Sequence, residues 1–350
     1  EYLPTILVTT RQDDGAGSLR DAIKAVAPGG TVQFAPALAG ETIFVTCGDI
    51  PVSRDLAVSG AGLVPGVVLD ALGLSRHFEV NGDATVTLDS LTLTGGRSDG
   101  TGRPLGYGGS IWVHDNADLT IRNATFHRNS ANSRGGALFV EDEARVLLEN
   151  STLTGNEAAV GGTAIQMDGD QLTLLHSTVT NHEASLIYGA LHAFSGTVEL
   201  GNSILAGNGR NLDTDPEATL LSTASLTAGN PHLAPLFNYG GSTPTMPPLP
   251  GSPAIEGGSL LPDLPISDQL GNPRLTGSLP DLGAVEAVPF SLLPLTSNDG
   301  DTIPDLLEGP DGPYGQLSSS IDDSALDSDQ DGSPDEEEFE NMTDPLDPTD

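Results

Sequence analysis

The middle of the chain repeats itself with a period of about 26 residues. One Asn or His position recurs at spacings of 27, 26 and 26 residues, at Asn123, Asn150, His176 and Asn202. A second position recurs at the same spacings, at Asn129, Asn156, His182 and Asn208. A fixed period in this range is typical of a solenoid, in which each structural unit stacks on the one before it.

Short apolar runs with a period of two lie between these positions. They are Leu119–Ile121, Val146–Leu148, Leu172–Leu174 and Val198–Leu200. Alternation over short β-branched runs that are broken by Gly and Asn indicates strands rather than helices. We therefore predict an all-β fold, a right-handed parallel β-helix. Its stacked Asn side chains hydrogen-bond along the stack at bends where the backbone is left-handed.

The prediction divides the chain into four segments. Residues 1–30 hold an N-terminal strand (Tyr2–Thr10) and a short helix (Ser18–Val26) that caps the first coil. Residues 31–229 form the β-helix, residues 230–288 close it, and residues 289–350 form an acidic tail. The cap is expected because a bare first coil exposes an apolar end and an unpaired strand edge. Residues 97–107 read as a polar loop that leaves the coil.

The charge of the chain limits its partners. It carries 49 acidic residues against 13 Lys and Arg, a net charge of −36. Such a surface argues against binding to nucleic acid or to an anionic membrane, and against polyuronate substrates unless calcium bridges the like charges. No apolar run is long enough to span a membrane. The single cysteine, Cys47, is expected to be a buried strand residue, with a reactive thiol as the minority alternative.

The tail contains the pattern of a calcium loop. Residues 291–350 hold 18 acidic residues and no Lys, Arg or His. One stretch has oxygen-bearing side chains at the spacing D-x-D-x-D-G with a closing Glu, which is what Ca²⁺ ligation requires. Its predicted ligands are Asp327, Asp329, Asp331, Ser333, Asp335 and Glu338. A weaker copy offers Asp299, Asp301, Asp305 and Glu308. The alternative is a solvated, disordered acidic tail.

Several of these motifs resemble known bacterial families. Ser18–Ile23 resembles the opening of large secreted β-helix proteins, and Gly135–Leu138 with Phe126–Asn129 resembles the paired repeats of polymorphic outer-membrane proteins, which are surface adhesins. Residues 238–286 are similar to the closing segment of the choice-of-anchor β-helix group, with Glu256 and Leu270 standing where that group usually has Asp and Arg. The tail resembles thrombospondin type 3 repeats. These resemblances imply a secreted or cell-surface location and say little about chemistry.

The predicted function is a non-enzymatic extracellular structural or adhesion protein. It would self-associate, with calcium-stabilised filaments as one form of assembly, or bind a cell-surface or glycan partner. The alternative is a carbohydrate-active enzyme, a polysaccharide lyase or a glycoside hydrolase. Its best candidate residues are Asp213, Asp215, Arg210 and His182. An outward column of Trp112, Phe139, Gln166 and His192 is either an exposed platform for sugars or proteins, or is covered by a neighbouring loop.

Overall fold

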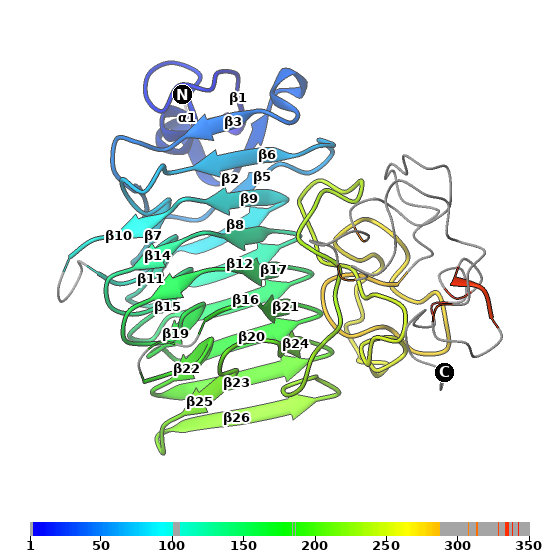
Figure 1. Ribbon diagram of the computed structural model, residues 1–350. Coiled ribbons are helices and arrows are strands. Elements are labelled where there is room, and N and C mark those ends of the chain that lie inside the picture. Colours follow the sequence, from blue (N-terminus) through cyan, green and yellow to red (C-terminus); the bar gives the residue numbers. More distant parts are fainter. Residues whose placement is uncertain are drawn as a thin grey trace.

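The computed structural model describes residues 3–100, 106–183, 185 and 187–287, together with residues 307, 313, 328, 333–335, 338 and 342. Its main body is a stack of coils whose short strands pair in parallel with the equivalent strands of the coils above and below (Figure 1). The predicted parallel β-helix is therefore confirmed.

The strands form three long sheets and one short one. Sheet A has nine strands: β1 (Leu3–Val8), β2 (Val26–Phe34), β5 (Leu56–Ser59), β8 (Thr85–Asp89), β12 (Asp118–Arg122), β16 (Arg145–Glu149), β20 (Gln171–Leu175), β23 (Gly196–Gly201) and β26 (Ala218–Thr223). Sheet B has seven: β3 (Thr42–Phe44), β6 (Val67–Asp70), β9 (Leu91–Thr94), β13 (Thr125–His127), β17 (Thr152–Thr154), β21 (Thr178–Thr180) and β24 (Ile204–Leu205). Sheet C also has seven: β4 (Ile50–Val52), β7 (Phe78–Val80), β11 (Ile111–Val113), β15 (Leu138–Val140), β19 (Ile165–Met167), β22 (Leu191–Ala193) and β25 (Leu212–Thr214). Sheet D has three: β10 (Arg97–Ser98), β14 (Ser130–Ala131) and β18 (Glu157–Ala158).

The period of two in the sequence places one side of each strand inside the coil. In sheet A, the register aligns Leu119 with Val146, Leu172 and Val198, and all four are buried. The neighbouring positions on these strands face outward and are half-buried or exposed. Each coil buries its apolar side chains against the coils next to it, because a single coil has no closed core of its own.

The Asn positions mark the bends, as predicted. Four residues of the first repeating position have left-handed backbone, with φ of 51°, 48°, 46° and 47°: Asn123, Asn150, His176 and Asn202. Asn adopts this region more readily than most residues, because its short amide hydrogen-bonds locally. The second position forms a buried side-chain ladder from Asn129 through Asn156 and His182 to Asn208.

The N-terminal cap is present, with small differences from the prediction. The strand is β1 and spans Leu3–Val8, and helix α1 spans Leu19–Ala25. Ser18 Oγ accepts a hydrogen bond from the Asp21 N–H at 3.1 Å, whereas the Ser18 N–H donates to the Gly15 carbonyl oxygen. The N-cap is therefore made without the reciprocal bond of a capping box. A 3₁₀ turn, η1 (Pro36–Leu38), follows β2.

One local prediction was wrong, and a second was wrong only at its start. Cys47 is exposed and lies in a bend after β3, because the chain turns there toward Asp13, whose Oδ2 accepts the Cys47 N–H at 2.5 Å. The expected loop at residues 97–107 begins as strand β10, which pairs with β14 one coil further on, and its residues 101–105 lie outside the described residues. It ends at Tyr107, which forms a bridge with Arg134.

Residues 230–287 fold back along the outward face of sheet B (Figure 1). The Gln269 side chain reaches three positions there: its Nε2 donates to Ala124 O and Thr125 Oγ1, and its Oε1 accepts from Thr152 Oγ1 at 2.7 Å. Arg274 Nη2 donates to Asn150 Oδ1. This segment therefore closes the polar outer face of sheet B rather than the end of the stack.

Candidate functional site on the outward face of sheet C

The outward column of sheet C is stacked as predicted. Trp112 pairs in register with Phe139, Phe139 with Gln166, and Gln166 with His192. The column is covered, however. Phe139 has no exposed surface, and the Tyr107 ring stacks on it with 4.7 Å between ring centroids. The Tyr188 ring stacks on His192 at 3.7 Å. Of the two alternatives, the structure shows the covered column and not an exposed aromatic platform.

A second row of polar side chains runs beside this column, shortly after the end of each strand. Trp112 Nε1 donates to Glu141 Oε2 at 2.9 Å. Gln166 Nε2 donates to Asp168 Oδ1 at 2.5 Å. Two of the carboxylates also have cationic or imidazole neighbours: Arg134 lies 3.5 Å from Asp168, and His192 Nε2 lies 3.6 Å from Asp215 Oδ1. Three coils thus contribute carboxylates to one polar row.

Only part of the predicted catalytic group is assembled. Asp213 and Asp215 both lie at β25, but Asp213 is held by the Gly189 N–H at 2.8 Å and by an ion pair with Arg210. Asp215 lies beside His192. His182 belongs to the buried Asn ladder, where it contacts Asn156 and Asn208. Its inclusion was wrong, because its position in the repeat places it inside a bend and not on the outer face of sheet C.

Burial keeps the interior histidines neutral. It lowers the pKa of His77 to about 4, that of His176 to about 3 and that of His182 to about 4. Burial also lowers the pKa of His192, against the opposing effect of the Asp215 carboxylate. A neutral imidazole donates one hydrogen bond and accepts one, which is how His182 fits between its two Asn neighbours.

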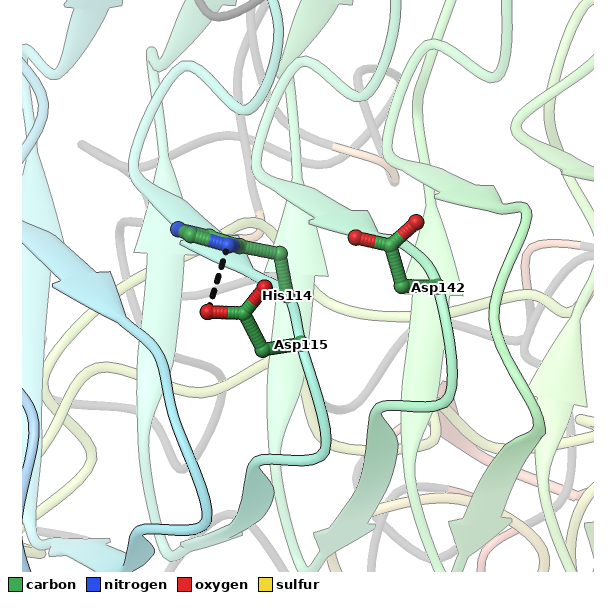
Figure 2. Close-up of side chains that lie close together, drawn as sticks. All are labelled: His114, Asp115 and Asp142. Atoms are coloured by element: carbon green, nitrogen blue, oxygen red, sulfur yellow. Dashed lines mark ion pairs between the residues drawn. The ribbon is translucent and has the colours of Figure 1, made fainter.

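A compact group of metal-ligand side chains lies at the edge of the same face. Within the part of the chain that the structure describes, His114, Asp115 and Asp142 each offer one ligand atom, and these atoms all lie within 4.8 Å of one another (Figure 2). Nothing in the repeat analysis singled out these residues. The signal that could have found them is the recurrence of Asp at equivalent positions after β11 and β15, which appears when the coils are aligned in register.

Most of the predicted calcium ligands lie outside the described residues. These are Asp299, Asp301, Asp305, Glu308, Asp327, Asp329 and Asp331. Ser333, Asp335 and Glu338 are described. Asp335 and Glu338 are buried, and Asp335 accepts hydrogen bonds from the N–H and the hydroxyl of Ser328 at 2.9 and 2.6 Å. The calcium prediction remains a prediction.

The comparison with known families agrees with this architecture. Residues 77–223 match a family model described as a right handed beta helix region, and this range runs from just before β7 to the end of β26. No curated protein matches the chain significantly. The chain is a right-handed parallel β-helix protein. No helix among its described residues is long and apolar enough to cross a membrane.

Proposed function

We propose that this protein is a non-enzymatic, extracellular structural or adhesion protein that assembles end to end. The observation that carries the proposal is the open end of the stack at β26. This strand is the last of sheet A, and β1 is the first (Figure 1). Leu220 continues an inward column whose preceding member, Val198, is fully buried, yet Leu220 is 39% exposed. Its neighbour Leu221 is 51% exposed.

The two ends differ in a way that favours head-to-tail contact. At the first coil, helix α1 buries Leu19 and Ile23 against the core, while the outer edge of β1 stays at the margin of sheet A. At the last coil, apolar side chains are exposed, and no strand of the described part of the chain pairs with the outer edge of β26. All sheet A strands run in one direction, so β1 of a second copy continues the sheet beyond β26 in the parallel sense. A head-to-tail contact of this kind does not close and generates a filament.

Calcium is the proposed ordering ion of the tail. The tail has no basic residue to neutralise its carboxylates, and Asp335 and Glu338 occupy the ninth and twelfth positions of the predicted loop. Both side chains are buried, as ligands that surround a cation would be. In the described residues, the Met342 carbonyl oxygen accepts the Gly251 N–H at 2.9 Å, which joins the tail to the closing segment.

Negative-stain microscopy of the full chain, in millimolar calcium and again with a chelator, tests the assembly. Leu220→Lys places a charge in the open apolar end and is expected to abolish fibres. Leu275→Lys changes an exposed leucine of the closing segment, away from β26, and is expected to leave fibres intact. Single short rods under both conditions would overturn end-to-end assembly. Fibres that are indifferent to the chelator would retain assembly and remove calcium from it.

One observation favours a second candidate, a carbohydrate-active enzyme. The Asp215 side chain is 30% exposed and lies beside the buried His192 imidazole, and such a pair can move a proton. Release of new reducing ends or unsaturated products from a panel of polysaccharides, with calcium present for the uronate-containing ones, lost in Asp215→Ala, would establish it. Asp213→Ala is the matched variant, because Asp213 is already engaged by Gly189 and Arg210. A panel without any product leaves a glycan or cell-surface protein as a binding partner only.

A further inference from the structure

His114, Asp115 and Asp142 come from two adjacent coils, and one ligand atom of each lies within 4.8 Å of the other two. His114 and Asp115 follow β11, and Asp142 follows β15 on the next coil (Figure 2). Asp115 and Asp142 both have left-handed backbone, with φ of 56° and 57°, so they occupy equivalent places in successive turns. Equivalent positions in neighbouring coils bring like charges close together, and a cation between them would lower their repulsion.

The backbone around the cluster is held by the ladder itself. The His114 N–H donates to the Val80 carbonyl oxygen at 3.0 Å, and the Glu141 N–H donates to that of Val113 at 2.9 Å. Asp115 Oδ2 accepts the Gly82 N–H at 3.2 Å. The ligand atoms therefore project from fixed positions on the stack, and no loop closure is required to bring them together.

The surroundings of His114 determine which ring nitrogen carries the proton. Nε2 lies 3.0 Å from Glu79 Oε1, and Nδ1 lies 3.5 Å from Asp115 Oδ2. A neutral imidazole has one N–H, so it can donate to only one of these two carboxylates. The shorter contact assigns the proton to Nε2. Nδ1, which lies 3.5 Å from Asp115 Oδ2, then carries the lone pair. A metal-bound histidine usually donates its other N–H to a carboxylate in this way.

We propose that His114 Nδ1, Asp115 and Asp142 bind a divalent first-row transition metal ion, such as Zn²⁺, with Glu79 orienting the histidine. One imidazole nitrogen with two carboxylates suits zinc or its neighbours, whereas calcium takes oxygen ligands. The ion neutralises the stacked Asp115 and Asp142 and ties one coil to the next. The Asp115 side chain is 57% exposed, so the remaining coordination positions face water and the site is open to exchange.

Trp112 provides a reporter for this site. It is the only tryptophan of the chain, and its ring stacks on the His114 ring with 3.9 Å between centroids. Paramagnetic Co²⁺ bound at His114 is expected to quench Trp112 fluorescence in a saturable, one-equivalent titration of the full chain. Zn²⁺ is expected to displace Co²⁺ and restore the emission, and Ca²⁺ at the same concentration is not.

Substitutions separate this site from general attraction of cations to an acidic surface. Asp142→Asn and His114→Ala are expected to weaken Co²⁺ binding at least about tenfold, and Glu79→Gln by about tenfold through the histidine's orientation. Asp118→Asn removes the same charge from a nearby exposed position outside the cluster and is expected to bind normally. Thermal melting without metal checks that each variant is folded. If His114→Ala does not fold, Asp142→Asn still tests the site, because it is the mildest of these substitutions.

Three outcomes would overturn the proposal. One is quenching that is equal in the wild type, Asp142→Asn and Asp118→Asn, which would show adventitious surface binding. Another is full displacement of Co²⁺ by Ca²⁺ at equal concentration. The third is the absence of saturable quenching in the wild-type chain. None of these outcomes bears on the calcium loop of the tail, so the site and the proposed function fail or stand separately.

Discussion

The side chains of Asn156 and His182 form one hydrogen bond inside the stack, with 3.1 Å between Asn156 Nδ2 and His182 Nε2. The amide N–H donates and the imidazole nitrogen accepts. On its other side, His182 Nδ1 lies 3.1 Å from Asn208 Oδ1 and donates to it. His182 thus takes the place of an Asn in the ladder as a neutral ring, and this has a consequence for stability in acid.

We predict that His182→Asn makes the protein more resistant to acid. The pKa of His182 is about 4 in the folded state, below the usual value near 6.5, because burial disfavours its charged form. As the pH falls below 6.5 the unfolded chain takes up the proton first, so stability is lost down to the folded pKa. The loss amounts to roughly 2–3 kcal/mol by pH 4.5.

Urea unfolding at pH 7.5 and pH 4.5 measures this effect. The difference in unfolding free energy between the two pH values is expected to shrink in His182→Asn by about that amount. His232→Asn, at a half-buried position outside the ladder, is the control for the replacement of a histidine by asparagine. An identical pH dependence in the wild type and His182→Asn would show that His182 does not titrate as its burial implies.

The Asn ladder also shows how much of the fold could be predicted from the sequence. The spacing of Asn129, Asn156, His182 and Asn208 predicts the stack and its register, because residues one period apart must lie above one another. It does not predict which bends share an outer face. His192, and not His182, lies beside Asp215. Which histidine reaches the outer face depends on the number of residues between a bend and the next strand, and the period alone does not give this number.

The sequence did not predict which segments cover the outer faces of the coils. Trp112 and Phe139 were correctly placed on the outside of the coil, but Phe139 is covered by the ring of Tyr107, whose place the period of the repeat does not predict. Cys47 was misplaced for a related reason. Its short apolar run looks like a strand, and the contact that pulls the chain out of the coil comes from Asp13, 34 residues away.

We predict that Gly136→Ala severely destabilises the stack. A Cβ atom at this position would overlap the backbone oxygen atoms of Thr163 and Glu157 on the next coil. Backbone atoms of a paired coil cannot move without breaking the ladder, so a loss of more than about 3 kcal/mol is expected. Gly109 has the same relationship to the Gly136 oxygen, so the same close contact is made by the preceding coil.

Gly155→Asn is the matched control for this substitution. Gly155 has a φ of 56°, a Cβ atom added there would have no neighbour within 4 Å, and Asn tolerates left-handed backbone. Its unfolding free energy should stay within about 1 kcal/mol of the wild type. Equal effects of Gly136→Ala and Gly155→Asn in chemical unfolding would contradict the account of close coil contact.

We predict that Arg274→Ala detaches the closing segment from sheet B. Arg274 is buried and pairs with the buried Glu286 at 2.9 Å, and it also donates to Ala284 O and Asn150 Oδ1. Removing the cation leaves an uncompensated buried carboxylate, at a cost of about 3–5 kcal/mol. Arg145→Ala, which removes an exposed ion pair with Asp170, should cost no more than about 1 kcal/mol.

Limited proteolysis shows whether Arg274→Ala destabilises the closing segment alone or the whole stack. Cleavage within residues 230–287 should accelerate in Arg274→Ala, while the strands of the stack stay protected, because the segment contributes few side chains to the main core. Cleavage that begins equally in the stack and in the closing segment would show instead that the two unfold as a single unit.

We predict that the Cys47 thiol reacts slowly although it is exposed. A hydrogen bond to the Asp13 carboxylate, together with the negative charge of Asp13, raises the thiol's pKa. The thiolate is the reactive form, so a higher pKa lowers the alkylation rate at neutral pH.

Asp13→Asn should shift the midpoint of the iodoacetamide rate against pH to a lower value. Asp14→Asn changes the neighbouring carboxylate and should leave the midpoint in place. Because Asp13 also pairs with Arg20 at 3.1 Å, the melting temperature of Asp13→Asn must be measured alongside. A midpoint that does not move in a folded Asp13→Asn protein would show that Asp13 does not control the thiol.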